Sequence, residues 1–148
     1  MNLAQALFSP RAIALVGASG DAAKDTARPL RFLRKHGYTG RIVTINASRS
    51  EVLGERAWSS LAEAPGEIDH AFVMTPGESV ERTLEECGTR GIPVVTILSG
   101  GFADVGAEGA ARRTLPCVSA EATVYLSEKR ASAAVRGDSW RATSSAAL

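Results

Sequence analysis

The sequence predicts an α/β fold, a Rossmann-like parallel sheet with helices on both faces. Four short runs rich in Val, Ile, Ala and Leu, at residues 12–16, 41–46, 70–74 and 93–98, have the composition of buried strands. Helical or turn segments separate these runs, and such βαβ units build parallel sheets through right-handed crossovers. With the strands numbered along the chain, we expect the order 3-2-1-4, which places their carboxyl ends along one ligand-binding edge.

The first strand ends in a turn made of small residues. Gly17-Ala18-Ser19-Gly20 directly follows the apolar run 12–16. Small side chains let a ligand approach the backbone, and free N–H groups at the start of the next helix attract an anion. The turn therefore predicts a nucleotide or phosphate site. The alternative is a plain strand-to-helix turn, because the full Gly-x-Gly-x-x-Gly spacing of a dinucleotide fingerprint is missing.

A helix is expected next, over about residues 27–36. Asp25 or Thr26 is a candidate cap, and Pro29 lies in the first turn, where a missing N–H is tolerated. Gly37 then ends the helix, because glycine readily adopts the conformation required at helix C-termini.

The remaining elements follow the second strand. We expect a loop at 47–54, a short helix or turn at 58–62, the third strand, and a helix over about 78–88. Cys87 recurs with other apolar residues of that helix at helical spacing, so it is interpreted as a core residue and not as a nucleophile.

Composition and charge argue against several functional classes. The 148 residues suffice for one domain with a core, and the formal net charge of +1 predicts no nucleic-acid partner. No apolar stretch approaches the about 18 residues of a spanning helix, so we expect no membrane insertion. Cys87 and Cys117 fit neither a disulfide framework nor a metal site, and we expect a cytoplasmic protein without metal.

No catalytic constellation can be assembled from the sequence. His36 lies at a helix end and His70 at a strand start, and both are interpreted as ordinary surface or edge residues. Neither paired carboxylates nor a Ser-His-Asp set is evident. We therefore expect no catalytic residues in this chain.

Several short motifs follow one another at characteristic spacing. They are Phe8-Ser9-Pro10-Arg11, Val16-Gly17-Ala18-Ser19, Ile45-Asn46, Glu51-Val52-Leu53-Gly54, Thr75-Pro76, Glu85-Glu86-Cys87-Gly88 and Ser99-Gly100-Gly101-Phe102. Jointly they resemble the CoA-binding domain of NDP-forming acyl-CoA synthetases, the group related to the alpha subunit of succinyl-CoA synthetase. The resemblance runs from about Leu7 to Gly109. It implies a CoA-binding domain over residues 7–110, with coenzyme A or acyl-CoA as its ligand.

The resemblance also implies which residues contact CoA. It implies Gly17, Ala18 and Ser19 at the phosphates and Asn46 beside the adenosine end. It also implies Thr75 and Pro76 along the ligand, and Ser99 and Gly100 near the pantetheine side. Backbone donors and hydroxyls of these types suit phosphate oxygens without a cation at every contact.

The loop after Asn46 departs from the family pattern. Family members commonly have Pro and then Lys directly after the Asn, whereas Ala47 and Ser48 stand here, followed by Arg49. Arg49 either replaces the lysine as a CoA contact or is a solvated loop residue. We expect weaker CoA binding as a result.

A larger departure begins near Ala110. Family members continue to a Gly-Pro-Asn segment, a second flavodoxin-like domain with an active-site histidine, and usually an ATP-grasp module. Residues 111–148 are instead rich in Ala, Ser and Arg, and we expect a divergent tail with a fifth strand at 122–126 and disorder elsewhere. A truncated or frame-shifted copy of a longer synthetase is one hypothesis that explains this loss.

Alternative functions remain open at this point. The first is a CoA-binding domain that lacks the catalytic modules and is not an enzyme by itself. The second is a split subunit of an NDP-forming acid–CoA ligase that acts in trans with an ATP-grasp partner chain. The third is an NAD(P)-binding domain, against which Asn46 stands where an acidic residue would bind the ribose. A module that binds only protein is a further possibility. An open sheet edge favours a partner chain or a homo-oligomer.

Overall fold

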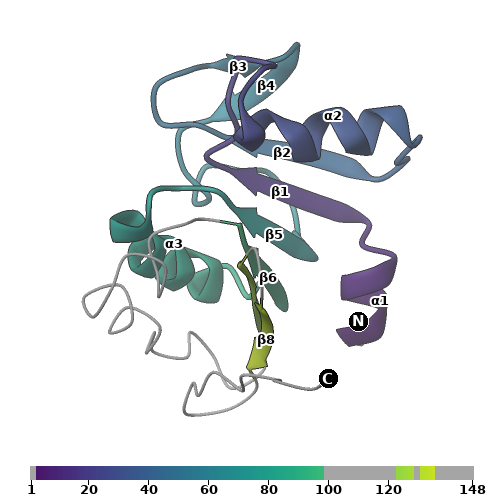
Figure 1. Cartoon of the computed structure of the whole chain (residues 1–148), viewed down its shortest axis with the longest axis vertical. Helices are drawn as coiled ribbons and strands as arrows, with labels where there is room; N and C mark the ends of the chain where they lie inside the picture. Colours follow the sequence, from purple (N-terminus) through teal and green to yellow (C-terminus); the bar gives the residue numbers. More distant parts are fainter. Residues whose placement is uncertain (1–2, 99–122, 129–130, 136–148) are drawn as a thin grey trace.

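The fold is one mixed sheet with helices packed on both faces (Figure 1). We describe it from a computed structural model, which places residues 3–98, 123–128 and 131–135. The strands are β1 (Ala12–Val16), β2 (Arg41–Ile45), β3 (Glu51–Val52), β4 (Glu55–Trp58), β5 (His70–Val73), β6 (Val94–Ile97), β7 (Thr123–Glu128) and β8 (Ala131–Val135). The helices are α1 (Leu3–Phe8), α2 (Arg28–Lys35), α3 (Gly77–Thr89) and a short 3₁₀ helix, η1 (Asp25–Ala27).

The strands lie in the order β3-β4-β2-β1-β5-β6-β7-β8. All neighbours from β4 to β7 pair in parallel, and only the edge strands β3 and β8 are antiparallel to their partners. The predicted α/β fold with a parallel sheet is therefore confirmed. The carboxyl ends of β1, β2 and β5 meet at one edge of the sheet.

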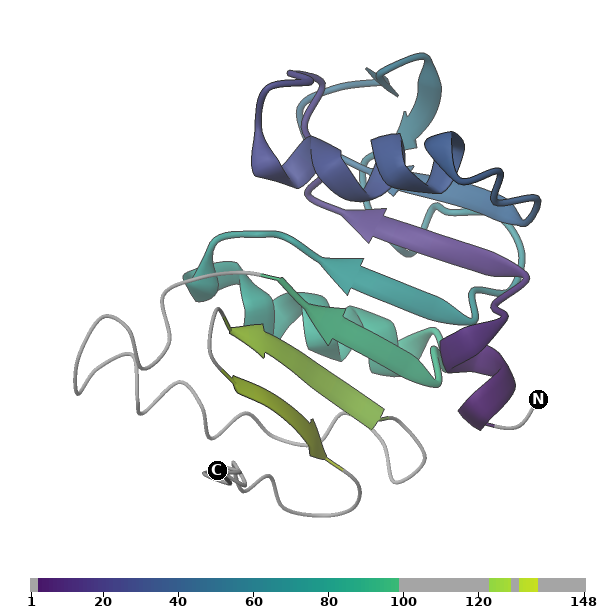
Figure 2. The same cartoon turned by 45° about the vertical axis from the view of Figure 1, so that its right-hand side comes forward.

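The two faces of the sheet carry separate apolar clusters. Ala14 and Val16 of β1 belong to a cluster that includes buried side chains of α3. Ile13 and Leu15 point the other way and share a cluster with Leu30 of α2. This alternation is what period-2 side-chain geometry gives a strand buried on both faces. It fixes α2 and α3 on opposite sides of the sheet (Figure 2).

The predicted strand order 3-2-1-4 is wrong. The third predicted strand, β5, pairs with β1 and not with β2, so the four strands lie in the order 2-1-3-4. The reason is that β4 pairs with the outer edge of β2 through Thr44 and Ala57, which leaves the other side of β1 for β5. The reversal of strand order therefore lies between β1 and β5.

The β3–β4 hairpin was not expected from the sequence, which predicts a loop and then a short helix or turn. Leu53 and Gly54 form its turn with φ of 49° and 83°. Positive φ at both central residues is typical of a type I′ turn, for which Asn-Gly is the usual signal. The hairpin could not be predicted from the sequence because leucine stands at the first central position, where Asn is usual.

Differences at α2 and in the last part of the chain are smaller. Ala27 is the N-cap of α2 and makes no side-chain cap bond, so the predicted cap at Asp25 or Thr26 is wrong. Asp25 pairs with Arg28 instead, at 3.6 Å. The predicted fifth strand is present as β7, whereas β8 lies where the sequence predicts disorder. Within the described ranges, no helix is long and apolar enough to cross a bilayer.

Candidate ligand-binding site

A polar pocket of about 310 Å³ opens at the carboxyl ends of β1 and β2. Two connections form it, the segment from β1 to α2 and the loop after β2. The described residues that line it are Gly17, Ala18, Ser19, Gly20, Lys24, Thr26, Asn46, Ser48 and Arg49. Loops at this edge of an open parallel sheet are the usual place for a ligand.

Gly17 lies at the floor of the pocket, where the ends of β1, β2 and β5 approach one another. Its N–H donates to the carbonyl oxygen of Ile45 in β2, at 2.9 Å. Its φ is +83°, and a Cβ built on it would lie 3.1 Å from the carbonyl carbon of Met74 and from the nitrogen of Thr75. Only glycine fits both the conformation and the close backbone approach, which brings β1 against the end of β5.

Asn46 links the two connections through its side-chain amide. Its Nδ2 donates to the carbonyl oxygen of Ala18 at 3.0 Å, and its Oδ1 accepts the backbone N–H of Ser48 at 2.9 Å. In the first turn, Ser19 Oγ accepts the N–H of Asp21 at 3.0 Å, which leaves the hydroxyl proton available to donate. Asn46 therefore shapes the pocket, and Ser19 presents a donor to it.

The pocket is positively charged. Lys24 and Arg49 line it, and neither forms an ion pair with a described residue. A Cβ built on Gly20 would lie 3.2 Å from Nη1 of Arg49, so this guanidinium reaches from the loop after β2 onto the first turn. No Asp or Glu is among the described lining residues. Such an arrangement favours an anionic ligand.

The structure brings most of the predicted site residues to this edge. Gly17, Ala18, Ser19, Asn46 and Arg49 line the pocket together. Thr75 and Pro76 follow β5 beside Gly17, and Thr75 Oγ1 is buried without a hydrogen-bond partner among the described residues. The predicted contacts Ser99 and Gly100 lie outside the described residues.

Gly20 belongs to the turn predicted to bind phosphate, but sequence reasoning missed three other lining residues, Lys24, Thr26 and Ser48. A lysine in the polar segment after the glycine turn was the available signal for Lys24. Its direction relative to the loop after β2 depends on how the segment folds over the sheet, which the sequence alone does not indicate.

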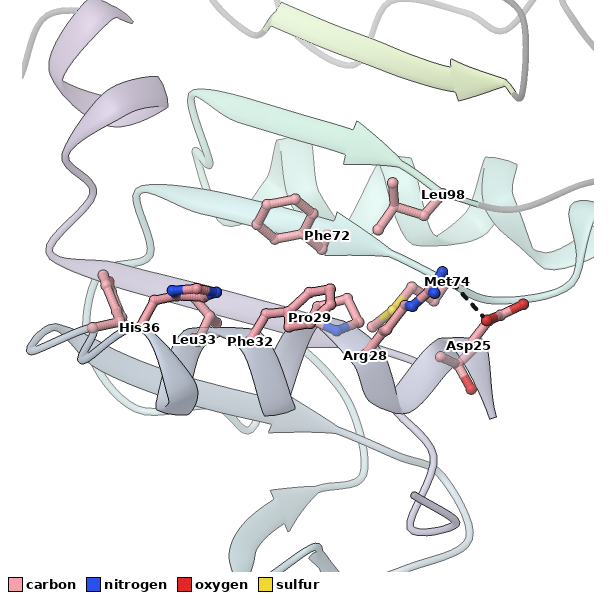
Figure 3. Close-up of a pocket in the computed structure, with 11 residues that line it drawn as sticks. Asp25, Arg28, Pro29, Phe32, Leu33, His36, Phe72, Met74 and Leu98 are labelled. Carbon is pink, nitrogen blue, oxygen red and sulfur yellow. Dashed lines mark ion pairs between the residues drawn. The ribbon is translucent and has the colours of Figure 1, made fainter. Parts of the chain in front are cut away.

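An apolar groove of about 780 Å³ adjoins the polar pocket (Figure 3). Pro29 and Phe32 of α2 face Phe72 of β5 across it, with Leu98 beyond the end of β6. Thr26 lines both the groove and the polar pocket, so the two cavities meet there.

The buried titratable side chains do not form a catalytic site. His70 is buried in the interior strand β5, so its interpretation as a surface or edge residue is wrong. Its Nε2 lies 2.8 Å from Thr96 Oγ1, and its ring stacks on Phe72. Burial lowers the pKa of His70 to about 4 and raises the pKa of Cys87 to about 12. Cys87 is a core residue, as predicted. In the part of the chain that the structure describes, no cluster of His, Cys, Asp and Glu could hold a metal.

A parallel sheet with a polar pocket over a glycine turn defines a ligand-binding domain of the Rossmann-like class. The chain belongs to a family described as the CoA binding domain, whose model matches residues 11–133. The family predicted from the short motifs is therefore confirmed.

Curated relatives include ADP-forming CoA ligases. The alpha subunit of ADP-forming acetate–CoA ligase II from Pyrococcus furiosus is 38% identical over 102 residues, which are 69% of this chain and 22% of the relative. The 4-hydroxybutyrate–CoA ligase (ADP-forming) of Nitrosopumilus maritimus is 33% identical over 106 residues, 72% of this chain and 15% of that protein. The chain thus spans less than a quarter of these two relatives.

A solved structure shares the fold. Dinucleotide-forming acetyl-coenzyme A synthetase 1 of Ca. Korarchaeum cryptofilum, in complex with phosphate and ADP, superposes with a TM-score of 0.67 and 32% identity. The match covers 76% of this chain and 25% of that one. The chain is therefore similar to about a quarter of a larger synthetase, and the NAD(P)-binding alternative is not favoured.

Proposed function

We propose that this chain binds coenzyme A or acyl-CoA at the carboxyl edge of its sheet. The observation that carries the proposal is the polar pocket, which joins a glycine turn with two cations and has no acidic residue among its described lining. CoA is a polyanion at neutral pH, and backbone N–H groups, Ser19 and the two cations suit its phosphates. Membership of the CoA binding domain family supports this choice among nucleotides.

The remaining predicted residues would contact the rest of the ligand. We place Thr75 and Pro76 along CoA and Ser99 and Gly100 toward its pantetheine end. The unpaired hydroxyl of Thr75 supports this placement, because a buried hydroxyl without a partner costs about 1–3 kcal/mol. A ligand on this edge of the sheet would supply the missing partner.

We further propose that the chain acts with a ligase partner and not as an enzyme alone. Among the described residues, His70 and Cys87 are buried, and the exposed His36 lies at the end of α2 and does not line the polar pocket. Relatives include ligase subunits, so an ATP-grasp chain is the partner that this proposal names. Cytoplasmic location and self-association through a sheet edge remain predictions.

Calorimetric titration with CoA, ADP and NAD tests the binding proposal. We expect saturable binding of CoA that is tighter than that of ADP or NAD. A Gly17→Ala variant should lose affinity, because its Cβ would press on the backbone of Met74 and Thr75. Gly37→Ala is the matched control, since Gly37 also has a positive φ but no neighbour within 4 Å of a built Cβ. A folded sample that does not bind CoA would overturn the proposal.

The ligase proposal has a separate test. Mixing the chain with an ATP-grasp subunit of a related ligase should give acyl-CoA formation that depends on both chains. Activity of the ATP-grasp subunit that is unchanged by this chain would contradict the partnership and leave the binding proposal intact.

A further inference from the structure

The apolar groove collects aromatic side chains from α2, from the turn after it and from β5. The whole chain has only four Phe, two Tyr and two Trp residues. Three of these side chains, Phe32, Tyr38 and Phe72, line the groove. His36 adds another ring to the lining, and its centroid lies 6.1 Å from that of Phe32. The groove is therefore aromatic as well as apolar.

Contacts within the protein hold two of these rings in place. The ring of Phe72 stacks on that of His70, with 4.5 Å between the centroids. The hydroxyl of Tyr38 donates to the carbonyl oxygen of Pro10 at 2.9 Å. Rings that are already fixed lose little further conformational freedom when a ligand binds. These parts of the groove wall are thus preorganised.

The apolar surface of the groove is open to solvent. Leu33 and Phe72 pack against the core cluster below them but are only partly buried, and Phe32 and Leu98 are exposed. Faces of a parallel sheet are normally covered. An exposed apolar surface in a concave place is typical of a binding site. This surface therefore suits an apolar group that comes from outside the described part of the chain.

The distribution of charge along the groove indicates what kind of molecule carries that group. Asp25 and Arg28 form an ion pair at 3.6 Å at one end, beside Thr26, where the groove meets the polar pocket. Phe32 and Leu33 lie further along α2, away from these charges (Figure 3). A molecule that fills both cavities must be charged at one end and apolar at the other. An acyl-CoA joins a charged nucleotide to an acyl group in this way.

We propose that the groove binds the acyl group of an aromatic acyl-CoA whose nucleotide lies in the polar pocket. This inference rests on the proposed function and adds the class of acyl group to it. Phe32 and Phe72 face each other across the groove, so a ligand ring between them would contact both. Aromatic pairs are more stable than their buried area alone explains. The groove volume of about 780 Å³ lies within the range of small-molecule sites, roughly 300–1,000 Å³.

Calorimetric titration of the natural chain with four ligands tests the inference. The ligands are CoA, acetyl-CoA, benzoyl-CoA and cyclohexanecarbonyl-CoA, whose ring has the same number of carbon atoms but is not aromatic. We expect benzoyl-CoA to bind about tenfold more tightly than acetyl-CoA, because its ring leaves water for an apolar site. It should also bind about threefold more tightly than cyclohexanecarbonyl-CoA, because only an aromatic ring forms favourable pairs with Phe32 and Phe72.

Two variants locate the acyl group. Phe32→Ala should reduce the preference for benzoyl-CoA over acetyl-CoA to about twofold or less, while CoA affinity stays within about twofold. Phe32 is already 48% exposed, so its replacement should leave the chain folded, which circular dichroism checks. Phe8→Ala is the matched control, since Phe8 is 80% exposed and does not line the groove. This control should keep the full preference.

Other outcomes separate this inference from the proposed function. Equal affinity of the natural chain for acetyl-CoA and benzoyl-CoA would overturn the inference while CoA binding stands. A benzoyl preference that Phe32→Ala retains in full, or that cyclohexanecarbonyl-CoA matches, would overturn it too. Sedimentation velocity tests a second copy as the occupant: a dimer that dissociates in Phe32→Ala, without any benzoyl preference, would assign the groove to self-association instead. A folded sample that binds neither CoA nor its thioesters would overturn the proposed function as well.

Discussion

The polar pocket and the apolar groove meet at Thr26, yet they are built in different ways. Backbone geometry and hydrogen bonds between two connections form the pocket: Gly17 bonds to Ile45, and Asn46 joins the turn after β1 to the loop after β2. The groove is formed by side chains of α2 and β5 that lie far apart in the sequence. The pocket is thus held by backbone geometry and hydrogen bonds, whereas the groove depends on the packing of apolar side chains.

The chemistry of the two regions differs as well. The pocket presents cations and N–H groups to solvent, while the groove leaves Phe32 48% exposed and Leu98 36% exposed. CoA combines a highly charged nucleotide end with a less polar arm. Under the proposed function, the preformed pocket holds the charged end.

Replacement of Gly17 by valine should have the largest effect. Its φ of +83° and the 3.1 Å approach of a built Cβ to the backbone of Met74 and Thr75 leave no room for a branched side chain. We expect a loss of about 3 kcal/mol or more in the free energy of unfolding, with loss of CoA binding. Gly37→Ala should cost only about 1–2 kcal/mol, because it has the conformational strain without the clash. Similar losses in both variants, measured by urea unfolding, would contradict the close packing at Gly17.

Acid should lower the stability of the folded protein through His70, whose ring stacks on the groove residue Phe72. Its pKa of about 4 lies below the usual 6.5, so the unfolded chain binds more protons than the folded one between these pH values. Stability should therefore fall as pH drops from about 6.5 to 4, by up to about 3 kcal/mol. A His70→Gln variant has no such titration and should show a flatter profile in urea unfolding at several pH values. Parallel profiles of the two chains would contradict a neutral buried His70.

Asn46→Asp should weaken the pocket without unfolding the chain. The carboxylate retains the acceptor for the Ser48 N–H but loses the donor to Ala18 and brings a negative charge between the two connections. We expect CoA affinity to fall about tenfold to thirtyfold, with about 1–2 kcal/mol lost in stability. Calorimetric titration at two salt concentrations separates the effect of the added charge from that of the lost hydrogen bond, because the electrostatic loss of affinity should shrink at high salt. An unchanged CoA affinity would show that Asn46 does not contribute to ligand binding.

Thr75→Val should have the smallest effect on the free protein and the opposite sign. Removal of an unpaired buried hydroxyl should raise stability by about 1 kcal/mol, while CoA affinity falls if the ligand is its partner. Thr96→Val is the control, because the Thr96 hydroxyl bonds to His70, and it should lower stability instead. A stability loss in Thr75→Val equal to that of the control would indicate a protein partner for this hydroxyl.

What the sequence predicts is what depends on neighbouring residues. The glycine turn, the strands 12–16 and 41–46 and the site residues next to them follow from local composition, because conformation and charge act over a few residues there. Strand order did not follow, since the position of β5 depends on β4 occupying the far edge of β2. Lys24 and the burial of His70 were missed for a similar reason: each depends on which distant element packs beside it.

The most direct test of the central claim is an amide NMR titration of the chain with CoA. We expect saturable shifts that are largest at Gly17, Ser19, Lys24 and Arg49, with smaller shifts at Phe32 and Leu33 of the groove. That result would assign the charged end of CoA to the polar pocket. Saturable shifts centred on the groove, or no shifts in a folded sample, would contradict the account.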